Sequence, residues 1–400
     1  MVENKSATFA SYTALFLLAL TLAGLIWSRA VLSIVHIFWL VAASIFFAKQ
    51  RHLFKKSRLL IWSITPLFLF LPGLYQQPFA KGNAAYIITL CIYPITALAV
   101  TFLLKNISEK KFLAIWMIFA VASLALPFYN YLQNFSGAYL MYARAKTLKV
   151  WMDADHVRYG LFLCSALLFL LFFNVSKLWL RYTVFTFIFL MIVLLASRTA
   201  WVGAALIILI YAWQKIRLTK YEKLRWLIPV ALVAGGAASY QFVDTVRGKI
   251  DYMVYDWQLF EAKKYNADFS DGTRRNINYT AWKVVTTEGK SNAGWAGISP
   301  TLKNSFKNYF PAQQTEYGWP FNQWLYWWIG AGWWTAILFT GWLFYPLVYG
   351  LKKRNYPLVT WTLIIAASCM VEATLSLQYG VFLHAWVIAI LWSTSEYDNL

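Results

Sequence analysis

Long runs of apolar residues recur along the whole chain, and short polar segments separate them. A helix needs about 20 predominantly apolar residues to cross a bilayer, and fewer where flanking side chains extend to the interface. We therefore predict an all-α polytopic membrane protein with about twelve transmembrane helices. The pattern leaves open whether the two short spans between 182 and 213 cross fully or form a tight helical pair. The predicted spans are 7–27, 30–48, 59–75, 85–104, 112–128, 159–174, 182–197, 200–213, 226–240, 323–350, 357–377 and 380–394.

Two segments between the predicted spans, about 129–158 and about 241–322, are too long to be turns, and the second is the longer. This second segment holds ten basic and eight acidic residues, and its apolar residues recur at helical spacing in places, as between Trp257 and Phe260. We predict a large, partly helical loop domain on the outer side of the membrane, between the ninth and tenth helices. Residues 1–240 then hold the first nine helices and residues 323–400 the last three, in one integrated membrane domain.

Composition and charge support a membrane protein and orient it. The chain has 400 residues, of which 60% are hydrophobic and 13% are charged, whereas soluble domains are about a quarter charged. Its formal net charge of +20 comes mostly from short basic clusters between apolar runs. Such clusters favour the cytoplasmic side, and their alternation predicts that both termini are cytoplasmic. The charge therefore indicates membrane topology rather than nucleic-acid binding. The clusters lie at 49–58, 105–111, 177–181, 215–225 and 352–354.

No sequence motif indicates a nucleotide or another cofactor. The chain lacks a glycine-rich phosphate loop of the Walker type and a dinucleotide-binding fingerprint. Asp153 and Asp155 before His156 resemble a short run of metal ligands, but one short run is weak evidence for a metal site. We therefore expect no cofactor and no metal, and a donor that a lipid carrier has already activated.

Four charged residues stand at or within the predicted outer membrane boundary. Arg198 lies in the short turn between two spans, and Arg274 and Arg275 are adjacent in the long outer segment. Glu372 falls about midway along the predicted eleventh span. Ionisable residues at such positions are costly and often functional. Arginines from separate outer elements form a natural clamp for a diphosphate, because guanidinium groups bind phosphate oxygens through paired hydrogen bonds.

A structural alternative accounts for the same residues without a ligand. Arg198 would extend to lipid headgroups, the adjacent arginines would be solvated, and Glu372 would pair with a polar neighbour. If the arginines do converge on one ligand, Glu372 would orient one of them.

Four segments resemble the O-antigen ligase and polymerase family of bacterial inner-membrane glycosyltransferases. The predicted twelve spans and the large loop between spans nine and ten are similar to the family architecture as well. The last of the four segments is similar to a motif of homologues from Bacteroidetes-like bacteria. The segments are 155–162, with His156 and Arg158; 197–201, with Arg198; 275–285, led by Arg275 and followed by Gly294; and 372–380, led by Glu372.

The resemblance implies an activity and assigns roles to these residues. Members of the family transfer a glycan from an undecaprenyl-diphosphate carrier to an acceptor hydroxyl at the periplasmic face, with inversion and without a metal. The acceptor is lipid A-core for the ligases and another lipid-linked glycan for the polymerases. By position, Arg198 and Arg275 would bind the diphosphate. Arg158 and Arg274 are further candidates for that task, and Glu372 completes the expected catalytic set.

The chain departs from the family at the start of the predicted tenth span. The ligases carry a Pro-His-Asn motif there, and its histidine is the proposed base. Here Phe321 stands in the place of that histidine, followed by Asn322 and Gln323 on the acceptor side. Phenylalanine cannot accept a proton, and a general base typically contributes about 10²–10⁴-fold. Either another group such as His156 or Glu316 substitutes, or the reaction needs no base, or the protein is not an active ligase.

These observations predict an O-antigen ligase-like glycosyltransferase that acts at the periplasmic face of the bacterial inner membrane. The absence of the histidine shifts weight toward a polysaccharide polymerase of the same family. A transporter or flippase of a lipid-linked or anionic solute is an alternative of another class, and an inactive homologue is a third. The diphosphate clamp requires that Arg198 and Arg275 share one cavity. The motif alignment requires Phe321 at the mouth of that cavity.

Overall fold

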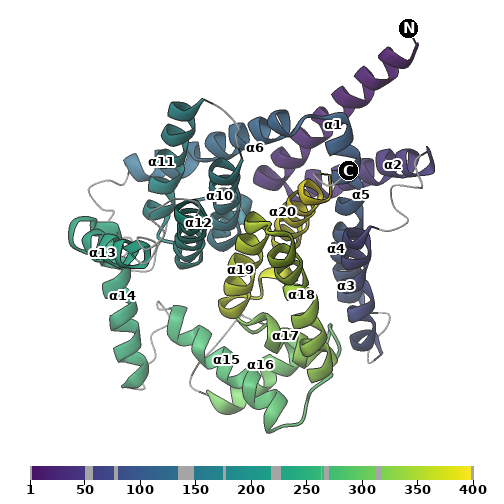
Figure 1. Ribbon diagram of the computed structural model, residues 1–400. Helices are drawn as coiled ribbons and strands as arrows, with labels where there is room; N and C mark the ends of the chain where they lie inside the picture. Colours follow the sequence, from purple (N-terminus) through teal and green to yellow (C-terminus); the bar gives the residue numbers. More distant parts are fainter. Residues whose placement is uncertain are drawn as a thin grey trace.

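The computed structural model describes an all-helical chain. It describes residues 2–49, 57–75, 80–133, 148–173, 177–217, 227–262, 264, 270–311, 313 and 318–397. Every regular element within these ranges is a helix, and Figure 1 shows that most of the helices gather in one bundle. The predicted all-α fold class is therefore confirmed.

The helices are named in chain order in Figure 1. The first half of the chain contributes α1 (Val2–Trp27), α2 (Arg29–Lys49), α3 (Arg58–Leu74), α4 (Lys81–Leu90), α5 (Ile92–Asn106), α6 (Glu109–Ser123), α7 (Ala125–Gln133), α9 (Trp151–Ala154), α10 (His156–Phe172) and α11 (Leu178–Leu195). The second half contributes α12 (Arg198–Arg217), α13 (Leu227–Phe242), α14 (Asp244–Glu261), α15 (Ser270–Thr286), α16 (Ile298–Tyr309), α17 (Gln323–Ala331), α18 (Trp333–Lys353), α19 (Tyr356–Val371), the 3₁₀ turn η4 (Thr374–Ser376) and α20 (Gln378–Tyr397).

Six helices in the described ranges are long and apolar enough to cross a membrane, which is typical of a membrane protein. A seventh candidate joins α13 to α14, but these helices are bent by 93° relative to each other. The apolar part of this pair is α13, because α14 carries six charged residues among eighteen. The count of twelve spans and their orientation stay predictions. The six candidates are Phe9–Trp27, Gly82–Asn106, Glu109–Gln133, Leu178–Leu195, Arg198–Ile216 and Trp333–Lys353.

The structure corrects two of the predicted spans. The predicted tenth span, 323–350, is broken at Gly332, where a φ of +90° separates α17 from α18. Glu372 does not lie midway along the eleventh span, because α19 ends at Val371 and Glu372 is its C-terminal cap. Apolar residues continue on both sides of each break, so the hydrophobic pattern alone did not reveal them.

The two short spans predicted between 182 and 213 are complete helices. Helix α11 has 18 residues and α12 has 20, and both are long and apolar enough to span a bilayer. A turn at 196–197 joins them, and Ala196 adopts a left-handed conformation there, with a φ of 52°. The turn brings Arg198 to the first position of α12.

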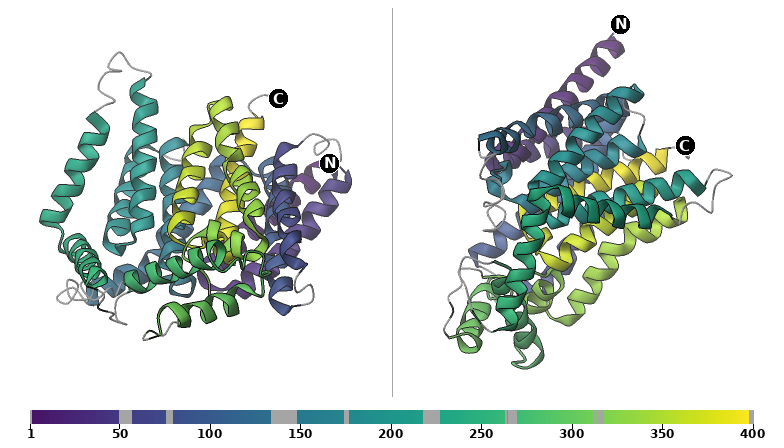
Figure 2. Two further views of the ribbon diagram at one scale, coloured as in Figure 1. Left: turned by 90° about the horizontal axis from the view of Figure 1, so that it is seen from below. Right: turned by 90° about the vertical axis from the view of Figure 1, so that its left-hand side faces the viewer.

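Helices α10 and α20 lie at the centre of the bundle, where most of their side chains are buried (Figure 2). Helix α12 approaches α10 closely because small residues face the contact. A Cβ on Gly160 would stand 2.7 Å from the Cβ of Ala200, and a Cβ on Gly203 would stand 2.8 Å from the sulfur of Cys164. This close packing fixes the end of α12 that carries Arg198.

The segment predicted as a loop domain contains three helices, α14, α15 and α16. Together with α17 they gather at one end of the bundle, at the bottom of Figure 1, and the views in Figure 2 agree. The predicted helical content of this segment is therefore observed. Its position on the outer side of the membrane stays a prediction.

Trp295 anchors this end segment to the bundle. Its indole N–H donates to the carbonyl of Phe70 at 2.8 Å, and the two rings stack with centroids 4.7 Å apart. The backbone beside it also pairs with α17, since Gly294 N–H donates to the carbonyl of Gly330 at 3.0 Å. A Cβ on Gly330 would stand only 2.5 Å from the Trp295 ring, so this contact requires glycine.

Candidate functional site

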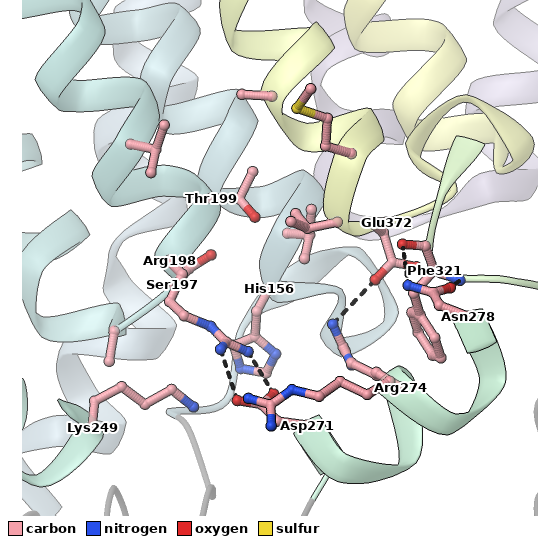
Figure 3. A pocket seen from close by; sticks show the side chains of 17 residues that line it. His156, Ser197, Arg198, Thr199, Lys249, Asp271, Arg274, Asn278, Phe321 and Glu372 are labelled. Atoms are coloured by element: carbon pink, nitrogen blue, oxygen red, sulfur yellow. Dashed lines mark hydrogen bonds and ion pairs between the residues drawn. The ribbon is translucent and has the colours of Figure 1, made fainter. Parts of the chain in front are cut away.

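A cavity of about 590 Å³ lies where the end segment meets the bundle. It is lined by residues from α10, α12, α14, α15 and α19, and by Phe321 just before α17 (Figure 3). Four basic side chains reach it, Arg198, Lys249, Arg274 and Arg275, together with the carboxylates of Asp271 and Glu372. The cavity therefore carries an excess of positive charge.

Arg198 enters the cavity from the first turn of α12 and is paired with Asp271 of α15. Its Nη1 donates to Oδ2 at 2.7 Å and its Nη2 to Oδ1 at 2.6 Å, which is a bidentate, charge-assisted pair. These bonds use two of the five guanidinium N–H groups. The side chain of Arg198 is 39% exposed and that of Asp271 only 7%, so the guanidinium remains accessible from the cavity while the carboxylate does not.

The start of α15 is held in place by Asp256 of α14. A side-chain oxygen of Asp256 accepts a hydrogen bond from the backbone N–H of Gly272 at 3.0 Å, which satisfies a donor at the helix N-terminus. Burial, and then the negative charge of Asp271, raise the pKa of Asp256. Burial also acts to raise the pKa of Asp271, but the hydrogen bonds and charge of Arg198 outweigh it, and that pKa is lowered.

Arg274 lies between a carboxylate and an aromatic ring. Its Nη1 is 3.4 Å from Oε2 of Glu372, and its guanidinium carbon lies 4.5 Å from the centroid of the Phe321 ring. The ion pair places Glu372 beside Arg274, and the role of Glu372 in orienting an arginine for a ligand stays a prediction. Phe321 lines the cavity but is only 3% exposed, and the Asn278 amide accepts from its backbone N–H at 2.8 Å and donates to its carbonyl at 3.3 Å.

Arg275 points back toward α14, where it lies over two aromatic rings. Its guanidinium carbon is 4.1 Å from the centroid of Trp257 and 5.1 Å from that of Phe260. Its Nη1 is buried and has no hydrogen-bond partner among the described residues. A buried guanidinium N–H without a partner is costly unless a ligand satisfies it, so Arg275 retains a donor for an anion.

Lys249 reaches the cavity from α14 and is 8% exposed. Its Nζ lies 4.8 Å from the centroid of the Tyr252 ring. Burial, and then the positive charges of Arg198 and Arg274, lower the pKa of Lys249 to about 8. A substantial fraction of this amine is therefore neutral near pH 8, which is unusual for lysine.

His156 lies at the first position of α10, with its ring toward the cavity (Figure 3). Its Nε2 is 2.7 Å from the carbonyl of Leu148, which can only accept, so Nε2 carries the proton. In the neutral ring Nδ1 is then the basic nitrogen. The N-cap of α10 is Asp155, which accepts from the backbone N–H of Arg158 at 3.0 Å.

Three residues predicted for the site are absent from the cavity lining. Arg158 is 4% exposed, and it donates to the carboxylate of Asp155 at 2.8 Å and to the carbonyl of Ala373 at 3.1 Å. Asn322 caps α17 by accepting from Leu325 N–H. Gln323 is fully buried, and its side-chain oxygen accepts from the backbone N–H of Leu375 at 2.8 Å. These side chains hold α17 and the 372–376 segment together.

The side of the cavity nearer the bundle is apolar. Val202 of α12 and Ala367, Met370 and Val371 of α19 line it. Val202, Met370 and Val371 are each about half exposed or more, at 48%, 63% and 54%. The cavity thus joins a polar, cationic end to an apolar surface between two helices.

The structure brings together most of the residues that the sequence indicated, and it adds others. Arg198 and Arg275 share one cavity, with Arg274, Glu372, His156 and Phe321. Lys249 and Asp271 were missed as site residues. A charge in an outer segment is commonly solvated, so neither residue stood out in the sequence. A possible signal was the spacing of Asp271 and Arg275, which places both on one face of a helix.

The short run that resembles metal ligands has other partners in the structure. Asp153 pairs with Arg29 at 2.6 Å, and Asp155 pairs with Arg158. Within the described ranges, no three His, Cys, Asp or Glu side chains are grouped so that they could hold a metal ion.

Comparison with known proteins gave no family assignment. No protein-family model matches the chain, and no curated protein matches it. The resemblance to O-antigen ligases and polymerases therefore depends on the short segments described above.

Proposed function

We propose that the protein is an O-antigen ligase-like glycosyltransferase. It would move a glycan from an undecaprenyl-diphosphate carrier to an acceptor hydroxyl, such as that of lipid A-core. The observation that carries this proposal is the convergence of Arg198 from α12 with Arg274 and Arg275 from α15 on one cavity that also has an apolar wall.

The cationic end of the cavity suits a diphosphate. Arg198 has three N–H groups that bond to none of the described residues. The Nη1 of Arg275 is buried and likewise has no hydrogen-bond partner among them. Guanidinium groups stay protonated throughout a reaction and bind phosphate oxygens in pairs. Such groups stabilise the charge that builds up on a departing diphosphate, and this electrostatic effect is usually large.

The apolar wall suits the isoprenoid part of the carrier. Val202, Met370 and Val371 present exposed apolar side chains between α12 and α19, next to the arginines. An amphipathic ligand would place its tail against these residues and its diphosphate against the guanidinium groups. A soluble nucleotide sugar has no apolar chain that would bury this wall.

In the proposed topology the chain crosses the bacterial inner membrane twelve times, with both termini in the cytoplasm. The cavity then opens at the periplasmic face, where helices α14 to α16 cover the bundle. The acceptor hydroxyl would attack the anomeric carbon opposite to the leaving diphosphate, so the transfer inverts the configuration. Because the positive charge comes from arginines, the proposed step requires no cofactor.

One observation favours a polymerase as the second candidate. Phe321 is buried under Arg274 in the place where the ligases carry their proposed catalytic histidine. The acceptor side of this chain therefore differs from that of the ligases in shape and chemistry. A second lipid-linked glycan as the acceptor would make the protein a polysaccharide polymerase that uses the same donor.

A reconstituted transfer assay tests the proposal. Purified protein in vesicles receives undecaprenyl-diphosphate-linked glycan, with or without lipid A-core, and products are separated by gel electrophoresis and mass spectrometry. We expect transfer by the wild type and a loss of about a hundredfold or more in Arg198→Ala and in Arg275→Ala, because each removes a charge from the transition state. Arg247→Ala, on α14 and outside the cavity, is the matched control and should keep its activity.

The acceptor separates the candidates. A product that requires lipid A-core supports a ligase, and chain extension without it supports a polymerase. Absence of transfer with both acceptors, together with arginine-dependent binding of the lipid diphosphate, would overturn the proposal and favour a transporter or an inactive homologue.

A further inference from the structure

Among the four lysine and arginine side chains of the cavity, Lys249 alone carries an amine, which can release a proton where a guanidinium cannot. It is 8% exposed, and its side chain runs from α14 toward Asp271 and Arg198 (Figure 3). Among the described residues, no carboxylate lies within 4.0 Å of its Nζ. Its amine contacts the face of the Tyr252 ring instead, at 4.8 Å from the centroid. A buried lysine without a close counter-ion is costly to keep charged.

The groups around Lys249 come from three helices. Arg198 of α12 and Arg274 of α15 are positive, and Asp271 of α15 and Asp256 of α14 itself are negative. Asp271 is committed to the bidentate pair with Arg198, and Asp256 accepts from the start of α15. The charges of both carboxylates favour the ammonium form, but within the described ranges neither carboxylate bonds directly to the amine, and burial and the two arginines outweigh them.

We infer that Lys249 is the proton acceptor for the acceptor hydroxyl, in the role that a histidine has in the ligases. The inference rests on the proposed function and deepens it by naming a base. Three features carry it: the amine reaches the same cavity as the three arginines, it lacks a carboxylate partner, and Phe321 offers no basic atom.

The step balances in charge and in atoms. The acceptor oxygen forms a bond to the anomeric carbon, and the bond from that carbon to the phosphate oxygen breaks, with its electron pair leaving on the diphosphate. The hydroxyl proton passes to the Nζ of Lys249, which becomes an ammonium ion. The diphosphate gains one negative charge as the amine gains one positive charge in the same cavity, so the total charge there is unchanged.

Burial and the two arginines support this role by lowering the pKa of Lys249 to about 8. A general base is most effective when its pKa is near the working pH, because enough of it is then unprotonated while it still accepts a proton well. The active form is the neutral amine. The ratio kcat/KM, which reports the free protein, should therefore rise about tenfold per pH unit below pH 8 and level off above it.

The test combines three variants with a pH profile in the reconstituted assay. Lys249→Arg keeps a positive charge but cannot release a proton, so we expect the transfer rate to fall at least about a hundredfold while binding of the lipid diphosphate is kept. The transfer rate of Lys249→Ala should fall by a similar factor, and added ethylamine should restore part of it. The pKa of ethylamine should then set the midpoint of the pH profile of the restored rate. Lys307→Arg, on the exposed face of α16, is the matched control.

A second readout does not depend on turnover. Amine acetylation of the intact protein at graded pH, followed by peptide mass spectrometry, should show Lys249 reacting with a midpoint near 8, as its lowered pKa requires. A midpoint for Lys249 at about 10, the ordinary value for a lysine, would overturn the inference. A Lys249→Arg variant with a normal transfer rate would also overturn it. If His156→Gln then loses the transfer activity, the base is His156.

Failure of the proposed function looks different from failure of this inference. If the wild type transfers no glycan, the proposed function falls and the role of Lys249 falls with it. If the wild type is active and its pH profile is the same in Lys249→Arg, only the assignment of the base is wrong.

Discussion

The pair of Arg198 and Asp271 defines the site at the level of single residues. Two charge-assisted hydrogen bonds of 2.6 and 2.7 Å join a helix of the bundle to a helix of the end segment. The carboxylate is nearly buried and the guanidinium is not. Asp271 therefore fixes the direction of the Arg198 side chain and leaves its other N–H groups open to a ligand.

Asp271→Asn should destabilise the protein by about 1–2 kcal/mol at pH 7. Hydrogen bonds to charged groups contribute about 1.5–3 kcal/mol, and the exposure of Arg198 reduces that value. Thermal unfolding in detergent measures the effect. Because the pKa of Asp271 is lowered on folding, its contribution is present above the ordinary pKa of 3.8 and is lost as the pH falls through the folded value. A difference between variant and wild type that grows on acidification would contradict this account.

The sequence indicated some residues of the site and could not indicate others. Arg198 and Glu372 stood out because they interrupt apolar runs, and both line the cavity. Lys249 lies in a segment with many charges, where nothing in the sequence distinguishes a buried amine from a solvated one. Arg158 is as basic as the others, but its guanidinium is bonded to carbonyls of the chain, which only the structure reveals.

At the level of elements, one helix break lies at the cavity, because α19 ends at Val371 and Glu372 lines the cavity. Hydrophobicity predicted continuous helices through Gly332 and Glu372, because the residues on either side are apolar. The breaks depend instead on backbone geometry, on a φ of +90° at Gly332 and on an extended conformation at Glu372. Helix existence could thus be predicted from the sequence, whereas the end of α19 beside the cavity could not.

Gly330→Ala should loosen the end segment from the bundle. The added Cβ would stand 2.5 Å from the ring of Trp295, and overpacking of this kind typically costs about 1–3 kcal/mol. We expect a lower melting temperature in detergent. Gly341→Ala is the matched control, because nothing lies within 4 Å of a Cβ at that helical position, and it should be neutral or slightly stabilising. Equal melting temperatures for both variants would show that Trp295 does not anchor the segment.

At the level of the whole molecule, the basic clusters predict which end of the bundle faces the cytoplasm. Lys352 lies in one of these clusters at the end of α18, and Lys307 lies on α16 near the cavity end. The two positions should therefore be on opposite sides of the membrane.

Cysteine labelling tests this arrangement in a background without the three native cysteines. Lys307→Cys should react with a membrane-impermeant maleimide added outside spheroplasts, and Lys352→Cys should react only after the membrane is permeabilised. The reverse pattern would place the cavity in the cytoplasm, and it would then be closed to the proposed acceptor.

The pairing of Arg198 with Asp271 also has a consequence for ion selectivity. An anion that binds the three remaining N–H groups meets a guanidinium whose charge Asp271 already largely neutralises. A monovalent ion such as chloride offers no more charge than the carboxylate, so it gains little by binding there, whereas a diphosphate brings at least two charges and several acceptor oxygens. Discrimination of this kind is a difference between two affinities. The internal carboxylate thus reserves the guanidinium for multivalent anions, even where simple salts are far more concentrated.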